Sequence, residues 1–469
     1  MTGKGRFAAS VLAPAAGLML LASGCKVGPN YSRPAVNVPG QYRGVAPDLS
    51  SQTAGAQPLG ETQWESVFQD ETLRGLIAEA LKNNYDMQIA ASRILQAEAV
   101  VGITRANQLP SVGGSGGVNY QRNALALNGP TIDSIGIQLN YIVDFWGKYR
   151  RATEAARAQL LASTYARSVV QTTLIANVAT AYFQMRQFDS QLEFSQKSLD
   201  GDNEILRINT IKFKGGESAI TDVYQADLLV QQAQAQVIAS QQAIAQAENQ
   251  ISILLGRNPG DIPRGLALVD QPHLAAIPTG LPSALVERRP DVRESEANLI
   301  AANANVGVAK AAYFPQLSLT GQFGAASTAL TSFLQGPATV WSLAGEVAQP
   351  LYAGGAITSA YHLAQEQRNQ AELSYRQTVQ EALGDVANSL VGYNQSRLYR
   401  IKIEEQTHTY EETARLANVR FTGGATSFLE VLVTQQQYFT SELALAQAWN
   451  TEMMYYVDVY QALGGGWQP

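Results

Sequence analysis

The chain is poor in the residues that build disulfide frameworks and metal centres. It has one cysteine, Cys25, and three histidines among its 469 residues. A single cysteine forms no intrachain disulfide, and so few cysteines and histidines do not make a Cys/His metal site within one chain. We therefore expect no metal and no cofactor.

Charged residues are also scarce. They make up 15% of the chain, against 46% hydrophobic residues, and the formal net charge is −6. A nucleic-acid-binding protein needs a basic face to meet phosphates. The composition therefore argues against nucleic acid as a partner.

No catalytic constellation is visible. Residues 113–117, Gly-Gly-Ser-Gly-Gly, match the nucleophile motif G-x-S-x-G in form, but no acid-then-histidine order accompanies them. The Gly-Gly pairs at 215–216 and 423–424 are not followed by Lys and Ser/Thr at the spacing of a phosphate-binding loop. We therefore expect that the protein is not an enzyme.

The first 24 residues have the pattern of a secretory signal peptide. Lys4 and Arg6 precede an apolar run that is too short to span a membrane, and Ala22-Ser23-Gly24 stand directly before Cys25. Small residues followed by cysteine resemble a bacterial lipobox, which implies that Cys25 becomes the lipid-modified first residue of the mature chain. The alternative is a chance cysteine after an ordinary signal peptide. Residues 25–62 are rich in proline and are expected to form an extended, lipid-anchored segment.

The rest of the chain is duplicated. The stretch 101–106 recurs at 306–311, 205 positions later, and 213–216 recurs at 421–424, 208 positions later, with further matches at the second separation. These landmarks predict a first repeat at 63–256 and a second at 283–469. Between them, the proline-rich residues 257–282 are expected to be an irregular connector.

Each repeat contains a stretch suited to a very long helix. Residues 148–213 and 356–421 contain no proline, so each can form a helix of roughly 99 Å at 1.5 Å per residue. Glycine-containing tips follow at 213–222 and 421–430, and helices are expected again at 223–256 and 431–463. In the first of these, Val223, Val230, Val237, Ile244 and Ile251 are seven apart, and so are Ala226, Ala233, Ser240, Ala247 and Leu254, which predicts a coiled-coil seam. Few charges and many glutamines on the other faces favour a water-filled helical tunnel over a solvated bundle.

Each repeat also offers one β-hairpin, at about 111–145 and 316–351. Residues 135–145 alternate between apolar and wetter side chains over the length of one membrane strand, and 341–351 repeat the pattern. Aromatic residues near the strand ends suit membrane interfaces; they are Tyr141, Phe145, Trp146, Trp341 and Tyr352. A soluble sheet is the alternative. Four strands leave open edges that lipid does not tolerate, so the chain must oligomerise, and two or three copies both remain possible at this point.

These features together resemble the TolC-like outer-membrane efflux ducts, in their lipoprotein (OprM/NodT-like) branch. The resemblance rests on the lipobox followed by residues 27–34, the duplication, the hairpin exits 144–147 and 350–355, and the tip segments 216–223 and 424–432. It implies a mixed fold, a trimer with a 12-stranded membrane β-barrel continuing into a 12-helix periplasmic tunnel. It also implies outer-membrane lipid, a periplasmic membrane-fusion adaptor and an inner-membrane pump of the resistance-nodulation-division (RND) type as partners, with passive export of drugs or other small molecules.

In that family the periplasmic end is closed at the hairpin tips. Carried over by position, Asp222 and Glu430 are the gate candidates, with Thr221, Arg420 and Phe421 as further candidates. The glycines that break the helices are Gly215, Gly216, Gly423 and Gly424. Three copies of an acidic tip residue around an axis would form a carboxylate ring that attracts cations and repels itself. The alternative is that Asp222 only caps or solvates its helix.

Two other interpretations of the function stay open. One is the outer-membrane exit of a protein-secretion system, although the lipobox favours the pump-linked branch. The other is a periplasmic coiled-coil scaffold tethered through Cys25, which leaves the alternating strands unexplained.

Overall fold

The computed structural model describes residues 26–43, 58–120, 131–272, 277–280, 282–328 and 338–467. The predicted signal peptide, residues 1–24, and Cys25 lie outside these described residues. The chain forms two compact units, and each takes segments from both halves of the sequence. Unit 1 comprises segments within 1–35, 92–164 and 294–377, and unit 2 comprises segments within 36–91, 165–293 and 378–469.

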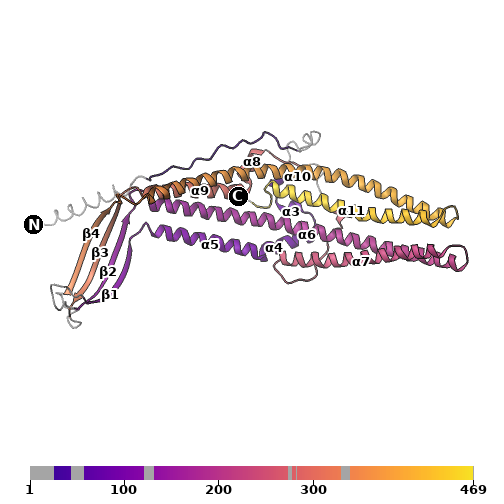
Figure 1. Ribbon diagram of the computed structural model, residues 1–469, viewed down its shortest axis with the longest axis horizontal. Helices are drawn as coiled ribbons and strands as arrows, with labels where there is room; N and C mark the ends of the chain where they lie inside the picture. Colours follow the sequence, from indigo (N-terminus) through magenta and orange to yellow (C-terminus); the bar gives the residue numbers. More distant parts are fainter. Residues whose placement is uncertain are drawn as a thin grey trace, which may run out of the picture. The chain divides into compact units, whose positions relative to one another are not determined.

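Unit 1 contains the sheet. Its strands are β1 (Ser111–Tyr120), β2 (Thr131–Val143), β3 (Gln316–Ser327) and β4 (Thr339–Ala348). They are antiparallel and lie in sequence order, so β1–β2 and β3–β4 are hairpins and β2–β3 joins the two halves of the chain (Figure 1). In the described part of the chain β1 and β4 are the edge strands.

The register sorts the side chains into two faces. Ile137 pairs with Phe323, which pairs with Trp341, and two positions away Leu139 aligns with Leu343 through Gly321. The other face carries the pairs Gln138–Gln322 and Asn140–Thr320. Ile137, Phe323 and Trp341 are 55%, 63% and 75% exposed. The sheet therefore has one polar face and one apolar face that the chain itself does not cover.

Two strands end earlier than the alternating pattern suggests. The pattern extends to Phe145 and Leu351, but β2 ends at Val143 and β4 at Ala348. After β2, the Asp144 carboxylate accepts hydrogen bonds from the backbone N–H groups of Tyr149 and Arg150, at 3.1 and 2.8 Å, and so caps the next helix. After β4, Pro350 has no N–H to continue a ladder.

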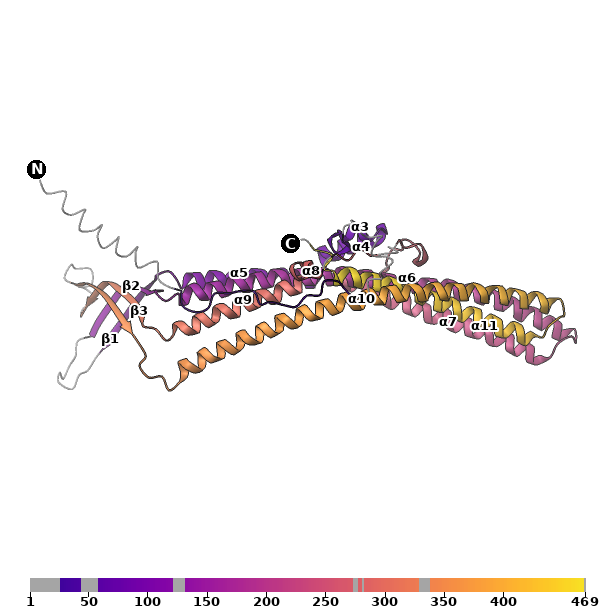
Figure 2. The same cartoon turned by 90° about the horizontal axis from the view of Figure 1, so that it is seen from above.

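Two helices of 67 residues run through the structure, α6 (Lys148–Lys214) and α10 (Ala356–Thr422). Each is followed by a 35-residue helix, α7 (Ile220–Leu254) after α6 and α11 (Phe428–Ala462) after α10. The α6–α7 and α10–α11 hairpins run alongside each other in unit 2 (Figures 1 and 2). The remaining elements are shorter; they are η1 (Leu59–Glu61), α3 (Trp64–Val67), α4 (Glu71–Asn83), α5 (Tyr85–Ala106), η2 (Leu268–Asp270), α8 (Pro282–Arg288) and α9 (Pro290–Ala311).

The seam of α7 is carried mainly by its small residues. Ala226, Ala233, Ser240 and Ala247 are all buried, as the heptad spacing predicts. The valines and isoleucines of the other heptad series are less uniformly covered. Val230 and Ile251 are buried, whereas Val223, Val237 and Ile244 are only half-buried. Small side chains let helix backbones approach closely, and α7 packs on α11.

Among the described residues, none of the helices combines the length and the apolar character that crossing a membrane would require.

Candidate functional site

The two hairpin tips have the same backbone. In the first, the N–H groups of Gly215, Gly216 and Glu217 donate to the carbonyls of Ile211, Phe213 and Lys212 at 2.9, 3.0 and 2.8 Å. In the second, Gly423, Gly424 and Ala425 donate to the carbonyls of residues 419, 421 and 420 at 3.0, 3.0 and 2.8 Å. Gly216 and Gly424 have φ values of +79° and +75°. Each long helix thus ends in the same glycine-terminated cap, 208 positions apart.

A hydrophobic cluster joins all four helices just behind the tips. Its buried members are Ile205 of α6, Ala226 of α7, Ala417 of α10, and Phe428 and Val431 of α11. Phe421, a predicted gate residue, packs against this cluster, and its ring centroid lies 5.5 Å from that of Phe428. Apolar burial therefore fixes the position of the second tip and of the first residues of α11.

The second tip pairs its charges internally. Glu430, in the first turn of α11, accepts a hydrogen bond from Arg420 Nη1 at 2.8 Å and another from the Thr426 hydroxyl. The Arg420 and Glu430 side chains are 56% and 37% exposed. The structure thus brings together two predicted site residues, and it adds Thr426, which the sequence pattern did not single out.

The first tip is arranged differently at the equivalent positions. Lys212 corresponds to Arg420, and its ammonium lies 3.9 Å from the centroid of the Phe421 ring, a cation–π contact between the tips. Asp222 corresponds to Glu430, but its carboxylate makes no hydrogen bond or ion pair with the described residues. Thr221 is exposed. Lys212 is a site residue that was not predicted from the sequence, although the 208-residue repeat already aligns it with Arg420.

The predicted membrane-interface aromatics occupy different positions along the sheet. Tyr141 lies two residues before the end of β2 and pairs with Leu319, whereas Trp341 is near the start of β4. Phe145 and Trp146 follow β2, and Tyr352, which is 92% exposed, follows β4. The Trp146 indole N–H donates to the Pro315 carbonyl at 2.8 Å. Its ring stacks on Phe314 with centroids 4.5 Å apart.

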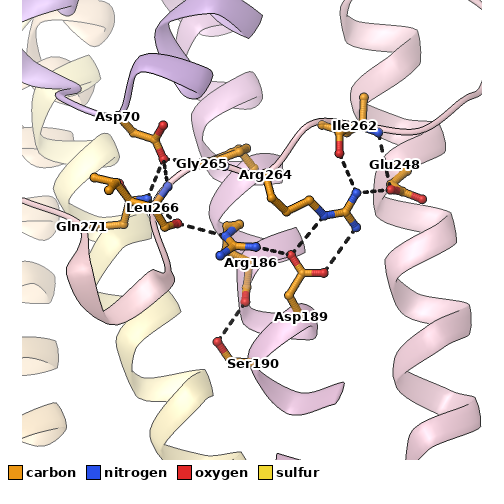
Figure 3. A network of polar contacts seen from close by, with 11 residues as sticks. Asp70, Arg186, Asp189, Ser190, Glu248, Ile262, Arg264, Gly265, Leu266 and Gln271 are labelled. Atoms are coloured by element: carbon orange, nitrogen blue, oxygen red, sulfur yellow. Dashed lines mark hydrogen bonds and ion pairs between the residues drawn. The ribbon is translucent and has the colours of Figure 1, made fainter. Parts of the chain in front are cut away.

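A polar network in unit 2 ties the connector to the helices, and no sequence motif predicted it (Figure 3). At one end, the buried Asp70 carboxylate accepts hydrogen bonds from the Tyr182 hydroxyl at 2.8 Å, and from Gln271 Nε2 and the Leu266 N–H at 2.9 Å. Burial raises the pKa of Asp70, but the hydrogen bonds from Gln271, Tyr182 and the backbone outweigh it and hold this pKa below its ordinary value.

At the other end of the network, Arg264 of the connector bridges two helices. Its guanidinium lies 3.3 Å from the Asp189 carboxylate of α6 and also forms an ion pair with Glu248 of α7. The Asp189 carboxylate also accepts a hydrogen bond from Arg186 Nη1 at 2.6 Å. The connector therefore links α6 and α7 through the ion pairs of Arg264. These residues lie far apart in the sequence with no repeated pattern, so no local signal marks them.

The comparisons with known proteins agree with this architecture. Residues 76–257 and 281–465 match the family described as outer membrane efflux protein. The chain belongs to this family. It is an outer-membrane channel for efflux, a transport duct and not an enzyme.

Relatives match over nearly the whole length of the chain. It is 33% identical over 463 residues to the solvent efflux pump outer membrane protein SrpC of Pseudomonas putida, covering 96% of this chain and 97% of the relative. It is 30% identical over 452 residues to the cation efflux system protein CusC of Escherichia coli O6:H1, with the same coverage. Among solved structures, the CmeC outer membrane channel of Campylobacter jejuni superposes with a TM-score of 0.88 at 27% identity, covering 95% of this chain and 96% of that one.

Proposed function

We propose that this protein is the trimeric, lipid-anchored exit duct of a tripartite efflux pump. Three copies would place their sheets edge to edge and close a barrel of twelve strands. The observation that carries this assembly is the sheet itself, which has an exposed apolar face and two edge strands, β1 and β4, in the described part of the chain. Lipid does not solvate backbone N–H and C=O groups, so a sheet in a membrane needs partners for both edges.

The partners follow from the same assignment. A duct in the outer membrane does no chemistry of its own, so an inner-membrane pump, of RND type, supplies the energy and a periplasmic adaptor connects the two. Relatives of similar identity are named for cation, solvent, toluene and antibiotic efflux. The proposed cargo of this chain is accordingly the broad class of drugs and other small molecules.

The anchor is part of the proposal. Cys25 would carry the lipid that fixes the mature chain to the inner surface of the outer membrane. Native mass spectrometry of the detergent-extracted protein tests both claims. Three copies with a lipid mass on each would support them, and a monomer without lipid would contradict them.

The hairpin tips are the proposed gate. The Arg420–Glu430–Thr426 contacts hold the second tip together, and the Lys212–Phe421 contact joins the first tip to it within one chain. The unpartnered Asp222 carboxylates of three copies would face other subunits at the narrow end of the tunnel. Gly215, Gly216, Gly423 and Gly424 would supply the breaks that turn each tip.

Single-channel conductance in planar lipid bilayers tests the gate. Replacing both Asp222 and Glu430 by Ala removes the carboxylates, and we expect a several-fold larger conductance because the closed tip loses its polar contacts. Glu217→Ala is the matched control, because it removes an exposed carboxylate from the turn of the first tip. Unchanged conductance in the double variant would remove Asp222 and Glu430 from the gate.

A further inference from the structure

The segment directly after Cys25 is held firmly against the rest of unit 1. This strap, residues 26–33, supplies three acceptors around the buried Arg151, whose Nη2 donates to Asn30 Oδ1 at 2.8 Å and whose Nε donates to the Val27 carbonyl at 3.3 Å. On the other side, Asn303 Nδ2 donates to the Pro29 carbonyl at 3.0 Å. Buried polar groups that are satisfied on several sides resist displacement, so the strap is a fixed part of the fold.

The far end of the strap is anchored equally well. The Glu296 carboxylate accepts the Tyr31 hydroxyl at 3.0 Å and two N–H groups of Arg33, at 2.7 and 2.5 Å. Between the two anchors, Gly28 passes so close to Gly307 that a Cβ on Gly28 would lie 2.5 Å from the Gly307 Cα. Only glycine fits this crossing.

The first residues of the strap lie against the segment that follows β2. The Val27 N–H donates to the Trp146 carbonyl at 3.1 Å, and the Lys26 Cα lies 3.0 Å from where a Cβ on Gly147 would be. Cys25 directly precedes Lys26 in the sequence, so a lipid on Cys25 is attached one residue before the strap. The strap therefore begins beside Trp146 and Gly147.

A cavity opens at the same place. It has a volume of about 340 Å³ and lies where β2, β3 and β4 meet the helices. Its lining is mostly apolar and aromatic, and includes Ile142, Phe145, Trp146, Phe314, Pro315 and Ile357. Hydrogen bonding and stacking brace Trp146 against Pro315 and Phe314, so the wall is preformed. An apolar cavity of about 150 Å³ already admits a benzene ring, so this one has room for several methylene groups of an acyl chain.

We propose that one acyl chain of the lipid on Cys25 occupies this cavity. The proposal rests on the lipidation of Cys25 proposed above. The strap begins beside Trp146, which also lines the cavity; Cys25 directly precedes the strap in the sequence, and the lining suits a hydrocarbon chain. The lipid would then complete the junction between sheet and helices, in addition to tethering the protein.

Photocrosslinking in cells tests the proposal on the full chain. Benzoylphenylalanine replaces Ile357, which lines the cavity, and in a control variant it replaces Leu363, which is on α10, 59% exposed and outside the cavity. After irradiation and trypsin digestion, we expect the peptide containing position 357 to be joined to the lipidated Cys25–Lys26 peptide. We expect a yield at least fivefold above that at position 363.

A second variant guards against chance proximity. Ala312→Trp fills the cavity from its wall, whereas Ala353→Trp adds the same ring at an exposed position outside it. With benzoylphenylalanine at 357, we expect Ala312→Trp to lower the lipopeptide yield at least fivefold and Ala353→Trp to leave it unchanged. The intact mass should show lipid on Cys25 in both variants.

The other outcomes overturn the proposal in distinguishable ways. A crosslink from position 357 to a free phospholipid means that membrane lipid fills the cavity, and a crosslink to another copy of the chain means that a neighbouring subunit covers it. Equal lipopeptide yields at 357 and 363 exclude a specific seat for the acyl chain. An unmodified Cys25 in the intact mass removes the lipidation itself, whereas lipidated protein without the crosslink removes only this inference.

Discussion

In the first hairpin tip, Lys212 reaches over the Phe421 ring of the second tip. In the second tip, the residue 208 positions later, Arg420, instead binds Glu430 of its own tip. The turns themselves share the same three backbone hydrogen bonds and a glycine of positive φ at the same place. The two repeats thus share the turn, because backbone sterics restrict its conformation. They differ in their charged contacts, which backbone sterics do not restrict.

The difference divides the proposed gate into two parts. The second tip is held by its own ion pair and by the burial of Phe428. The first tip depends on the second through Lys212 and leaves Asp222 without a partner in the described chain. Four substitution pairs, from the largest expected effect to the smallest, test this division.

Phe428→Ala should have the largest effect, because Phe428 is only 3% exposed, in the cluster that joins all four helices. We expect a loss of about 3 kcal/mol in local stability. The matched variant is Ile220→Ala at the equivalent position of the first tip, where the side chain is 41% exposed and the expected loss is about 1 kcal/mol. Hydrogen exchange of the tip amides measures both, and equal losses would contradict the division.

Asp202→Asn should change the pH dependence of stability. Burial raises the pKa of Asp202 of α6 to about 6, above its value in the unfolded chain. The Asp202 carboxyl therefore binds more protons in the folded state between about pH 4 and 6, so its contribution to the free energy of unfolding falls as pH rises through this window and is level above it. We expect Asn to stabilise the protein by about 2 kcal/mol at pH 8 and by little at pH 4.

Thermal unfolding at several pH values checks this prediction. Asp200→Asn, an exposed site on the same helix, is the control and should change neither the midpoint nor its pH dependence. The second hairpin has Tyr410 at the position equivalent to Asp202, so it has no counterpart of this particular carboxylate. A pH profile unaltered by Asp202→Asn would show that the buried carboxylate is not its source.

Gly216→Ala and Gly424→Ala should destabilise their tips equally. Both glycines have positive φ, and a Cβ added at either one would have no neighbouring atom within 4 Å, so the loss is conformational and amounts to about 1 kcal/mol at each site. Gly215→Ala and Gly423→Ala, at negative φ, are the controls and should have smaller effects. Limited proteolysis at the tips compares the four variants, and a clear difference between 216 and 424 would mean that the two turns are not equivalent.

Lys212→Met should have the smallest effect, because it removes only the cation–π contact. A double-mutant cycle with Phe421→Leu should give a coupling energy of about 0.5 kcal/mol. The exposed Lys214→Met provides the control and should show no coupling to Phe421. Zero coupling for Lys212 would mean that its contact with the Phe421 ring does not help to hold the first tip against the second.

Much of this architecture could be predicted from local pattern. The absence of proline predicts the long helices, and period-two alternation predicts the strands, because both signals depend on the backbone and on the faces of a single element. Asp222, Arg420, Phe421 and Glu430 could be proposed because the duplication marks the tips.

Other features depend on contacts between distant segments. The Asp70 and Arg264 network joins residues from three stretches of the chain, and each is ordinary in its own stretch. Arg151 is another example. In the sequence it resembles an exposed residue on the surface of a helix, but in the structure the strap covers it. Lys212 is the exception, since comparison of the two repeats would have paired it with Arg420.

The pairing of β2 with β3 sets a condition on how the protein is made. Residues 133–143 of one strand align with 317–327 of the other, so almost two hundred residues separate the partners at the centre of the sheet. Non-local pairing of this kind is slow, because the entropy of closing a long loop is lost before any contact compensates it. The first hairpin must therefore wait, with an apolar face and an open edge, until the second has been exported. During that interval the nascent chain is most exposed to aggregation and most in need of a chaperone.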